Sequence, residues 1–417
     1  MESIVIVIFV LGYLAIALEH PIKINKTATA LLTGVVCWTL FALGSDLPVV
    51  EDLSHHLGGI AEILFFLLGA MTIVEMIDAY QGFSVITDKI RTENPKILLW
   101  IICWIAFFLS AILDNLTTSI VMVSVLRKLI PNKEMRLFFA GMIVIAANAG
   151  GAWTPIGDVT TTMLWIGGQI TTVNIMKTLL IPSIACLLVP LIILSFTLKG
   201  SLTESEMTHE GSSDVKGKVL MLVVGVAMLI FVPIFKTITH LPPYIGMMFG
   251  LGITWVVSEF INPHADEEQR KPYTAAAALS RIDVSSMLFF LGILLAVGAL
   301  ESMHILRDVA VWLDETVKSQ SIIITIIGLM SAIVDNVPLV AASMGMYDMS
   351  AYPVDHFIWE YLAYCAGTGG SILIIGSAAG VAVMGIEKID FMWYLKKISL
   401  LALLGYLAGA GIYLILH

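Results

Sequence analysis

Charged residues are scarce in this sequence. Only 13% of the 417 residues are charged, whereas 58% are hydrophobic and the mean hydropathy is +0.94. A soluble domain carries about 25% charged residues, so this chain has too little polar surface to cover a water-soluble particle. The composition therefore predicts a protein that is largely surrounded by a lipid bilayer.

Basic residues and cysteines are especially few. The chain has 22 Lys and Arg against 32 Asp and Glu, a formal net charge of −10. Nucleic acids are bound mainly through basic side chains on phosphates, so a nucleic-acid partner is excluded. The four cysteines lie in apolar segments without a C-x-x-C pair, which predicts small hydrophobic residues and neither metal ligands nor disulfides: Cys37, Cys103, Cys186 and Cys365.

Motifs of membrane enzymes are also absent. The sequence has no H-E-x-x-H, no G-x-S-x-G and no Gly-x-Gly-Asp pair. The first would supply zinc ligands and the second a nucleophilic serine. We therefore expect neither an enzyme nor a protein that needs a cofactor.

Long apolar segments, by contrast, fill the chain. Crossing the hydrocarbon core of a bilayer takes about 20 apolar residues. Segments of that order run over 2–19, 28–45, 59–79, 97–126, 134–165, 178–198, 217–236, 243–261, 283–303, 321–346, 357–386 and 391–416. The sequence therefore predicts an all-α polytopic membrane protein.

The segment 97–126 is too long for one crossing, because a straight helix of that length spans about 45 Å. Short loops rich in Lys and Arg stay cytoplasmic, and such loops flank this segment on both sides: Lys89, Arg91 and Lys96 before it, and Arg127, Lys128, Lys133 and Arg136 after it. The segment is therefore predicted to be a re-entrant hairpin that enters and leaves on one side. Lys23 and Lys26 lie in the loop after the first span, whereas the next loop is acidic, and this contrast places the N-terminus outside.

The chain is predicted to consist of two halves. A polar stretch at 199–216 separates residues 1–198 from 217–417 and is expected to be a cytoplasmic linker. The motif SAILDN at 110–115 recurs 221 residues later as SAIVDN, and AGGAWTPIG at 149–157 is answered 219 residues later by TGGSILIIG. Matches in the same order at nearly one offset indicate a duplication.

The second half is predicted to be inserted upside down. The first half has an odd number of crossings, and the loops around the second hairpin are acidic, as expected outside: Asp308, Asp314, Glu315, Asp348 and Asp355. Each repeat then has about five transmembrane helices plus one re-entrant hairpin, with broken helices at the midplane, and both termini lie outside. This architecture is typical of secondary transporters.

Two aspartates at the hairpin tips are the first candidate site residues. An ionisable residue at membrane depth is costly unless it has a function or a partner. Asp114 and Asp335 are each followed by an asparagine, Asn115 or Asn336, and preceded one helical turn earlier by a serine, Ser110 or Ser331. These oxygen-bearing side chains suit a hard cation. The alternative is that they only cap the broken helices, but their duplication favours a function.

The third candidate is Asp158, which follows the helix breakers Gly150, Gly151 and Pro155. It can cap the next half-helix, but its counterpart in the second half is Ser377, so the fold does not require a carboxylate there. We therefore expect Asp158 to bind or exchange a cation. Other residues near the two breaks could add oxygen ligands: Asn148, Thr160, Thr161, Thr368 and Ser371.

The paired SAILDN and SAIVDN motifs, together with GGAWTPIGDVTT followed by Met-Leu-Trp, resemble the NhaD-type sodium/proton antiporters of the ion-transporter superfamily. The resemblance extends from the first span to the last. It implies a homodimer, a scaffold and a mobile transport domain, and exchange of Na⁺, with Li⁺ as a further substrate, for H⁺. Dicarboxylate carriers of this fold typically carry Ser-Asn-Thr at the hairpin tips, where this chain has Asp-Asn.

The sequence thus predicts a secondary antiporter in a bacterial inner membrane. Na⁺ is expected at Asp114, Asp158 and Asp335, with Asp158 and one of the two tip aspartates forming a site that Na⁺ and H⁺ occupy in turn. A protonated carboxyl group is a poor sodium ligand, so the two ions compete. The alternative function is a sodium-coupled anion carrier of the same fold, for a dicarboxylate or arsenite.

Overall fold

The computed structural model of the protein describes residues 2–44, 49–87, 92, 94–197, 215, 217–261, 271–333 and 335–417. Within these ranges the regular structure is entirely helical. The linker predicted at 199–216 lies outside the described residues except for residue 215. The helices before it are α1 Glu2–Ala17, α2 Glu19–Ile22, α3 Lys26–Gly44, α4 Val49–Ala79, α5 Ser84–Thr87, α6 Pro95–Leu113, α7 Asn115–Leu129, α8 Lys133–Gly151, α9 Val159–Ile166 and α10 Thr172–Thr197.

The second half of the chain is helical as well. Its elements are α11 Lys218–Thr239, α12 Pro243–Ile261, the 3-10 helix η2 Lys271–Tyr273, α14 Ala275–Leu279, α15 Val284–Ser302, α16 Ile305–Val317, α17 Gln320–Met330, α18 Asn336–Met346, α19 Phe357–Gly369, α20 Ala378–Glu387, α21 Phe391–Lys397 and α22 Ser399–Leu416. The longest element that was not predicted is α16. Three acidic residues that the sequence assigned to a loop lie on this helix: Asp308, Asp314 and Glu315.

Eight of the described helices are long and apolar enough to cross a membrane: α3, α4, α6, α10, α11, α12, α15 and α22. Large apolar side chains on these helices are exposed, among them Phe65, Phe196 and Phe260. Exposed apolar surface of this extent requires a lipid environment. The prediction of a multi-pass, all-helical membrane protein is therefore confirmed. The cysteines are free and buried, as expected.

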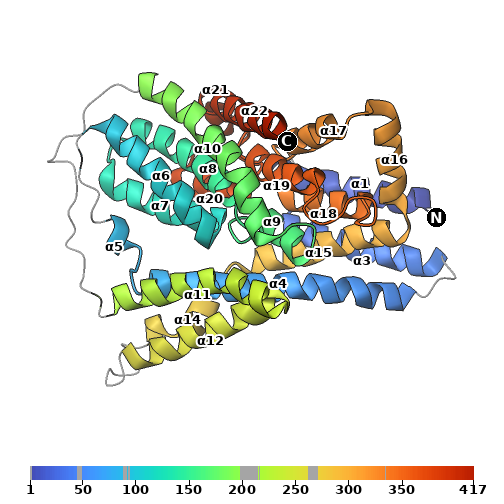
Figure 1. Ribbon diagram of the computed structural model, residues 1–417, viewed down its shortest axis with the longest axis horizontal. Helices are drawn as coiled ribbons and strands as arrows, with labels where there is room; N and C mark the ends of the chain where they lie inside the picture. Colours follow the sequence, from blue (N-terminus) through green and yellow to red (C-terminus); the bar gives the residue numbers. More distant parts are fainter. Residues whose placement is uncertain are drawn as a thin grey trace.

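The helices pack in two groups (Figure 1). One group, called here the α4 group, contains α1, α3, α4, α11, α12, α14 and α15. The other, called the α8 group, contains α6, α7, α8, α10, α17, α19, α20 and α22. The short helices α9 and α18 pack on each other and connect the groups, because α9 also contacts α4 and α18 also contacts α15.

Two of the predicted helix breaks are confirmed. The segment 134–165 divides into α8, which ends at Gly151, and α9; the segment 357–386 divides into α19 and α20. Close backbone contacts hold both breaks. A Cβ atom on Gly150 would lie 2.1 Å from the carbonyl oxygen of Phe107, and one on Gly369 would lie 2.0 Å from that of Gly328. Glycine is therefore the residue that fits at both positions.

The two Asp-Asn motifs also lie at helix breaks. Asp114 separates α6 from α7, with φ at 120°, a conformation that L-residues rarely adopt. Asp335 directly precedes α18, after a turn that follows α17. The helices α6 and α7 pack against each other and both against α8. The re-entrant course of these helix pairs in a bilayer, and the inverted relation of the halves, stay predictions.

Candidate functional site

Each of the three predicted aspartates caps the first turn of a helix. Asp114 accepts a hydrogen bond from the backbone N–H of Thr117 (2.7 Å), Asp158 from that of Thr160 (2.9 Å) and Asp335 from that of Val337 (3.4 Å). A carboxylate at a helix N-terminus also benefits from the positive end of the helix dipole. All three aspartates therefore act as N-caps of their helices, and each keeps carboxylate oxygen atoms available for further partners.

Asp158 is the centre of the site. Its side chain is only 1% exposed. The Oδ1 atom accepts a hydrogen bond from the Thr160 hydroxyl (2.8 Å), and Oδ2 accepts one from the Asn115 amide nitrogen (2.6 Å). The amide nitrogen of Asn336 lies 3.5 Å from both carboxylate oxygens. The two repeat-related asparagines thus meet at one carboxylate.

Polar side chains continue the network from Asp158 into the second half. The Asn115 amide nitrogen also donates to Oδ1 of Asn148 (3.1 Å), and the Asn148 amide donates to the hydroxyl of Ser377 (3.0 Å). Ser377 caps α20 by accepting from the backbone N–H of Gly380 (3.2 Å). The network therefore joins the starts of α7, α9 and α20 with the last turn of the buried helix α8.

The electrostatics of this network are unbalanced. The side-chain donors to the Asp158 carboxylate are neutral amides and a hydroxyl, and no basic side chain of the described residues forms an ion pair with it. A buried carboxylate without a counter-ion is strongly unfavourable. Asp158 is therefore expected to hold either a proton or a bound cation, and the surrounding oxygen atoms suit a hard cation.

Asp114 and Asp335 differ in their partners. The Asp114 carboxylate accepts hydrogen bonds from Thr117, including one from its hydroxyl at 2.8 Å, and the described residues include no basic partner. The Asp335 carboxylate instead forms an ion pair with Lys26, with 3.0 Å between Nζ and Oδ2. Among the described residues no group of three or more His, Cys, Asp or Glu side chains gathers to hold a metal ion.

The remaining predicted hydroxyls bind backbone carbonyls. Ser110 donates to Ala147 (2.6 Å), and its counterpart Ser331 donates to Ala366 (2.8 Å). These bonds attach α6 to α8, and the turn after α17 to α19. The other hydroxyls donate to backbone carbonyls three or four residues earlier in the chain: Thr161 to Asp158 (2.8 Å), Thr368 to Tyr364 (2.6 Å) and Ser371 to Thr368 (2.6 Å). None of these five hydroxyls has a hydrogen bond to the Asp158 carboxylate.

Sequence reasoning missed several polar residues in the interior. Thr118 and Ser119 follow Asn115 by three and four residues, on the same face of α7. Both are fully buried, and their hydroxyls have no hydrogen-bond partner in the described part of the chain. Their spacing from Asn115 is visible in the sequence, so it could have identified them. Buried hydroxyls that share a helix face with Asn115 are candidate ligands for a bound cation.

Two buried glutamates were missed as well. Glu387, at the end of α20, pairs with Arg127 (2.7 Å) and Arg136 (2.8 Å), so basic residues assigned to a loop instead join α7, α8 and α20. Glu360, 2% exposed, accepts hydrogen bonds from Asn174 and from the Tyr413 hydroxyl (2.9 Å). Each lies near the end of an apolar segment, where a charge resembles an ordinary flanking residue.

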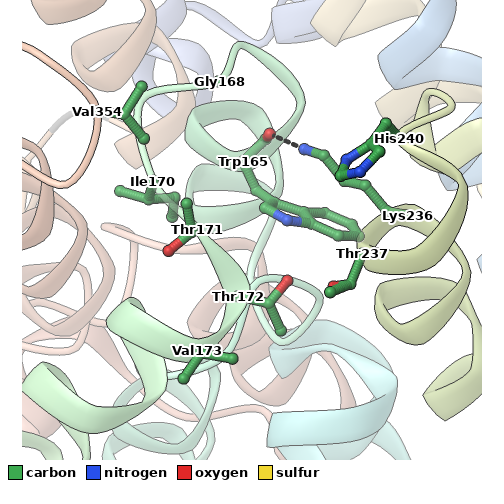
Figure 2. A pocket seen from close by; sticks show the side chains of 10 residues that line it. All are labelled: Trp165, Gly168, Ile170, Thr171, Thr172, Val173, Lys236, Thr237, His240 and Val354. Carbon is green, nitrogen blue, oxygen red and sulfur yellow. Dashed lines mark hydrogen bonds between the residues drawn. The ribbon is translucent and has the colours of Figure 1, made fainter.

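A pocket of about 310 Å³ lies beside α9, where the α8 group meets α11 (Figure 2). The Lys236 ammonium group donates a hydrogen bond to the carbonyl oxygen of Trp165 and lies 4.4 Å from the centre of the indole ring. Thr171 and His240 also line the pocket. Lys236 thus places a positive charge at the C-terminal end of α9, where the helix dipole favours it.

Comparison with known proteins agrees with this geometry. The Na(+)/H(+) antiporter NhaD of Vibrio cholerae is 32% identical over 461 residues, which cover 99% of this chain and 91% of that protein. The chain belongs to the NhaD family of sodium/proton antiporters. This NhaD-family chain also matches, over residues 13–367, the family model described as citrate transporter. Sodium/proton antiporter 1 of Arabidopsis thaliana is 51% identical over 98% of this chain and 72% of its own length.

Membership of the NhaD family confirms three predictions. The family resemblance noted in the sequence is correct, and the protein is a transporter and not an enzyme. The ligands of this family are the transported ions and not a cofactor. Relatives named Na(+)/H(+) antiporter NhaD also occur in Alkalimonas amylolytica, with 29% identity over 99% of this chain. The NhaD-family chain is therefore a membrane transporter of the sodium/proton antiport class.

Proposed function

We propose that this chain exchanges Na⁺, and also Li⁺, for H⁺, and that the two ions compete for Asp158. The observation that carries the proposal is the burial of the Asp158 carboxylate, 1% exposed and hydrogen-bonded by Asn115 at 2.6 Å, without a basic partner among the described residues. A group in this setting needs a cation or a proton. Asp114, which directly precedes Asn115 in the chain, carries the second carboxylate of the site.

Competition between the ions couples their movement. Na⁺ takes oxygen ligands, and the charged Asp158 carboxylate and the Thr160 hydroxyl supply them. Protonation removes the negative charge of the carboxylate, so a proton and Na⁺ cannot both be bound well. An empty, charged carboxylate is costly inside the protein, which disfavours crossing the membrane with neither ion. Exchange follows from these two conditions.

We assign residues 1–198 and 217–417 to two inverted repeats, each with a re-entrant hairpin. Matching contacts support the assignment: Gly150 approaches Phe107 as Gly369 approaches Gly328, and the two tip serines donate to equivalent helices. We infer an elevator-like movement of the α8 group against the α4 group, with α9 and α18 between them, in a homodimer. The basic loops support an N-terminus outside, and the bacterial relatives support a bacterial inner membrane.

The test is proton flux in everted membrane vesicles for the Asp158→Asn variant. Asn keeps the size and the capping oxygen but cannot carry the charge, so exchange should fall at least about 100-fold. Asp308→Asn, on the exposed face of α16, is the matched control and should transport normally. Normal Na⁺-dependent proton movement in the Asp158→Asn vesicles would reject the assignment.

The rival function is a sodium-coupled anion carrier, since the matched family model is described as citrate transporter. Asp158 and Asp114, which have no basic partner among the described residues, oppose it, because two carboxylates repel an anionic substrate. Sequential additions of Na⁺, Li⁺, K⁺, succinate and arsenite to the same vesicles separate the two functions. An antiporter responds to Na⁺ and Li⁺ alone, whereas a carrier responds only when the anion is present with sodium.

A further inference from the structure

Lys26 and Asp335 form an ion pair that joins residues 309 positions apart in the chain. The Lys26 ammonium nitrogen lies 3.0 Å from Oδ2 of Asp335, and the side chains are 24% and 11% exposed. Lys26 is the first residue of α3, and Asp335 caps α18. The pair therefore connects a helix of the α4 group to a short helix that lies between the two groups.

The surroundings of Lys26 hold its charge in place. The ammonium group lies 4.5 Å from the centre of the Phe289 ring on α15, a distance suited to a cation–π contact. The backbone N–H of Lys26 donates to the Glu19 carboxylate (3.2 Å). A positive charge at the first residue of a helix opposes the helix dipole. Among the described residues, the Asp335 carboxylate is the ion-pair partner that compensates the positive charge of the ammonium group.

Among the described residues the first Asp-Asn motif has no equivalent of this pair. Asp114 occupies the matching place in that motif, yet its carboxylate accepts hydrogen bonds from the backbone and the hydroxyl of Thr117. The second-half helix α12 begins at Pro243 and contains no Lys or Arg. The two motifs are alike in sequence but differ in their ion pairing. Among the described residues Asp114 has no basic partner, whereas Asp335 pairs with the Lys26 ammonium group.

We propose that Lys26 is a tethered cation that occupies Asp335 in place of a transported ion, so that transported Na⁺ and H⁺ use only Asp158 and Asp114. The proposal rests on the proposed exchange of Na⁺ for H⁺ at Asp158. Of the two duplicated tip aspartates, it limits ion binding to Asp114. Asp335 then serves as a positioning residue: its ion pair with α3 fixes the start of α18, and with it the amide of Asn336 beside Asp158.

The physical basis is the cost of an unpaired buried charge. Removing one partner of a buried ion pair leaves the other charge uncompensated and is strongly destabilising, whereas replacing both partners by neutral groups is often tolerated. Lys26→Gln and Asp335→Asn should each be harmful on their own. If the carboxylate is needed only to balance the ammonium group, the double variant should recover. If the carboxylate ligates the transported ion, the double variant should be inactive.

The test measures initial rates of Na⁺-dependent proton movement in vesicles for the two single variants and the double variant. We expect each single variant to lose at least about tenfold in rate, and the double variant to return to within about threefold of the unaltered chain. Lys23→Gln, at an exposed lysine three residues earlier that caps the end of α2, is the matched control and should be unaffected. A double variant that is no more active than Asp335→Asn overturns the proposal.

A second measurement does not depend on how the variants fold. A membrane-permeant carbodiimide activates the Asp335 carboxyl group, the neutral amine of Lys26 displaces the urea, and an amide bond forms while the carbodiimide takes up the elements of water. Mass spectrometry should detect the Lys26–Asp335 linkage in the unaltered chain, at a yield that saturating Na⁺ does not change. A yield that Na⁺ lowers several-fold, or no linkage, overturns the proposal.

The two proposals fail in distinguishable ways. If the unaltered chain and Lys23→Gln show no Na⁺-dependent proton movement, the exchange function is rejected, and the carbodiimide yield still reports on the ion pair. If both of these transport normally while the double variant is as inactive as Asp335→Asn, the exchange function stands and the role of Lys26 as a tethered cation is rejected.

Discussion

The amide nitrogen of Asn115 lies 2.6 Å from Oδ2 of Asp158 and 3.1 Å from Oδ1 of Asn148. One side chain thereby links the break between α6 and α7 to the break between α8 and α9. A ligand that changes the charge of Asp158 must change this hydrogen bond as well. The contact therefore couples ion binding to the relative position of four helices.

The two asparagines beside Asp158 should contribute unequally to sodium binding. A hydrogen bond to a charged group contributes about 1.5–3 kcal/mol, and Asn115 makes such a bond at 2.6 Å, whereas Asn336 lies at 3.5 Å. Asn115→Ala should raise the Na⁺ concentration for half-maximal exchange by roughly 10-fold or more, and Asn336→Ala by less. Sodium titrations of proton flux check the order; equal effects would contradict it.

Thr118 offers a test of the unpartnered hydroxyls on α7. If its buried hydroxyl becomes a ligand of the transported cation, Thr118→Val, which keeps the shape, should weaken Na⁺ binding by about 1–3 kcal/mol. Thr118→Ser keeps the hydroxyl and is the matched control. Sodium-dependent thermal stabilisation of the purified protein measures the change. An unaltered sodium dependence in the valine variant would exclude this hydroxyl from the site.

The close contact at Gly150 should make the helix break intolerant of any side chain. A Cβ atom there would lie 2.1 Å from the Phe107 carbonyl oxygen, so Gly150→Ala must displace backbone and should cost several kcal/mol of stability. Gly411→Ala, at a position on α22 with open space, is the control and should be neutral or stabilising by up to about 1 kcal/mol. Thermal unfolding in detergent compares the two.

Protons should compete with sodium at the site. A single carboxyl group that binds either ion links the two equilibria, so once the proton predominates, each fall of one pH unit raises the half-maximal Na⁺ concentration about tenfold. The maximal rate at saturating Na⁺ should change less. Initial rates across a matrix of pH and Na⁺ concentrations test this. A half-maximal concentration that does not depend on pH would rule out a shared carboxylate.

The positions of the helix breaks were predictable from the sequence, and the reason is local. Gly150, Gly151 and Pro155 cannot continue a helix without loss, and Asp158 is a favoured cap for the next one. Apolar length likewise predicted most of the spanning helices. The amphipathic helix α16 was not found, because its charges interrupt the apolar run on which the prediction depended.

Charges close to the ends of segments were the hardest to interpret. Lys26, Arg127 and Arg136 were counted as loop residues that indicate orientation. The structure places them in ion pairs with Asp335 and Glu387. Counting charge along the chain cannot distinguish a solvated lysine from one that meets a carboxylate 309 positions away.

By itself the sequence determined the class of the protein and predicted the duplication and the candidate aspartates. The reason is that apolar segments, helix-breaking glycines and repeated motifs are defined by residues that are neighbours in the chain. Tertiary structure alone decided which candidates meet. It brought Asn115 and Asn336 to Asp158 and joined Asn148 to Asn115 and Ser377. It also gave Asp335 a lysine, while no basic side chain in the described part of the chain pairs with Asp158. The energy of a buried charge depends on what surrounds it in space, and packing supplies those neighbours from distant parts of the chain.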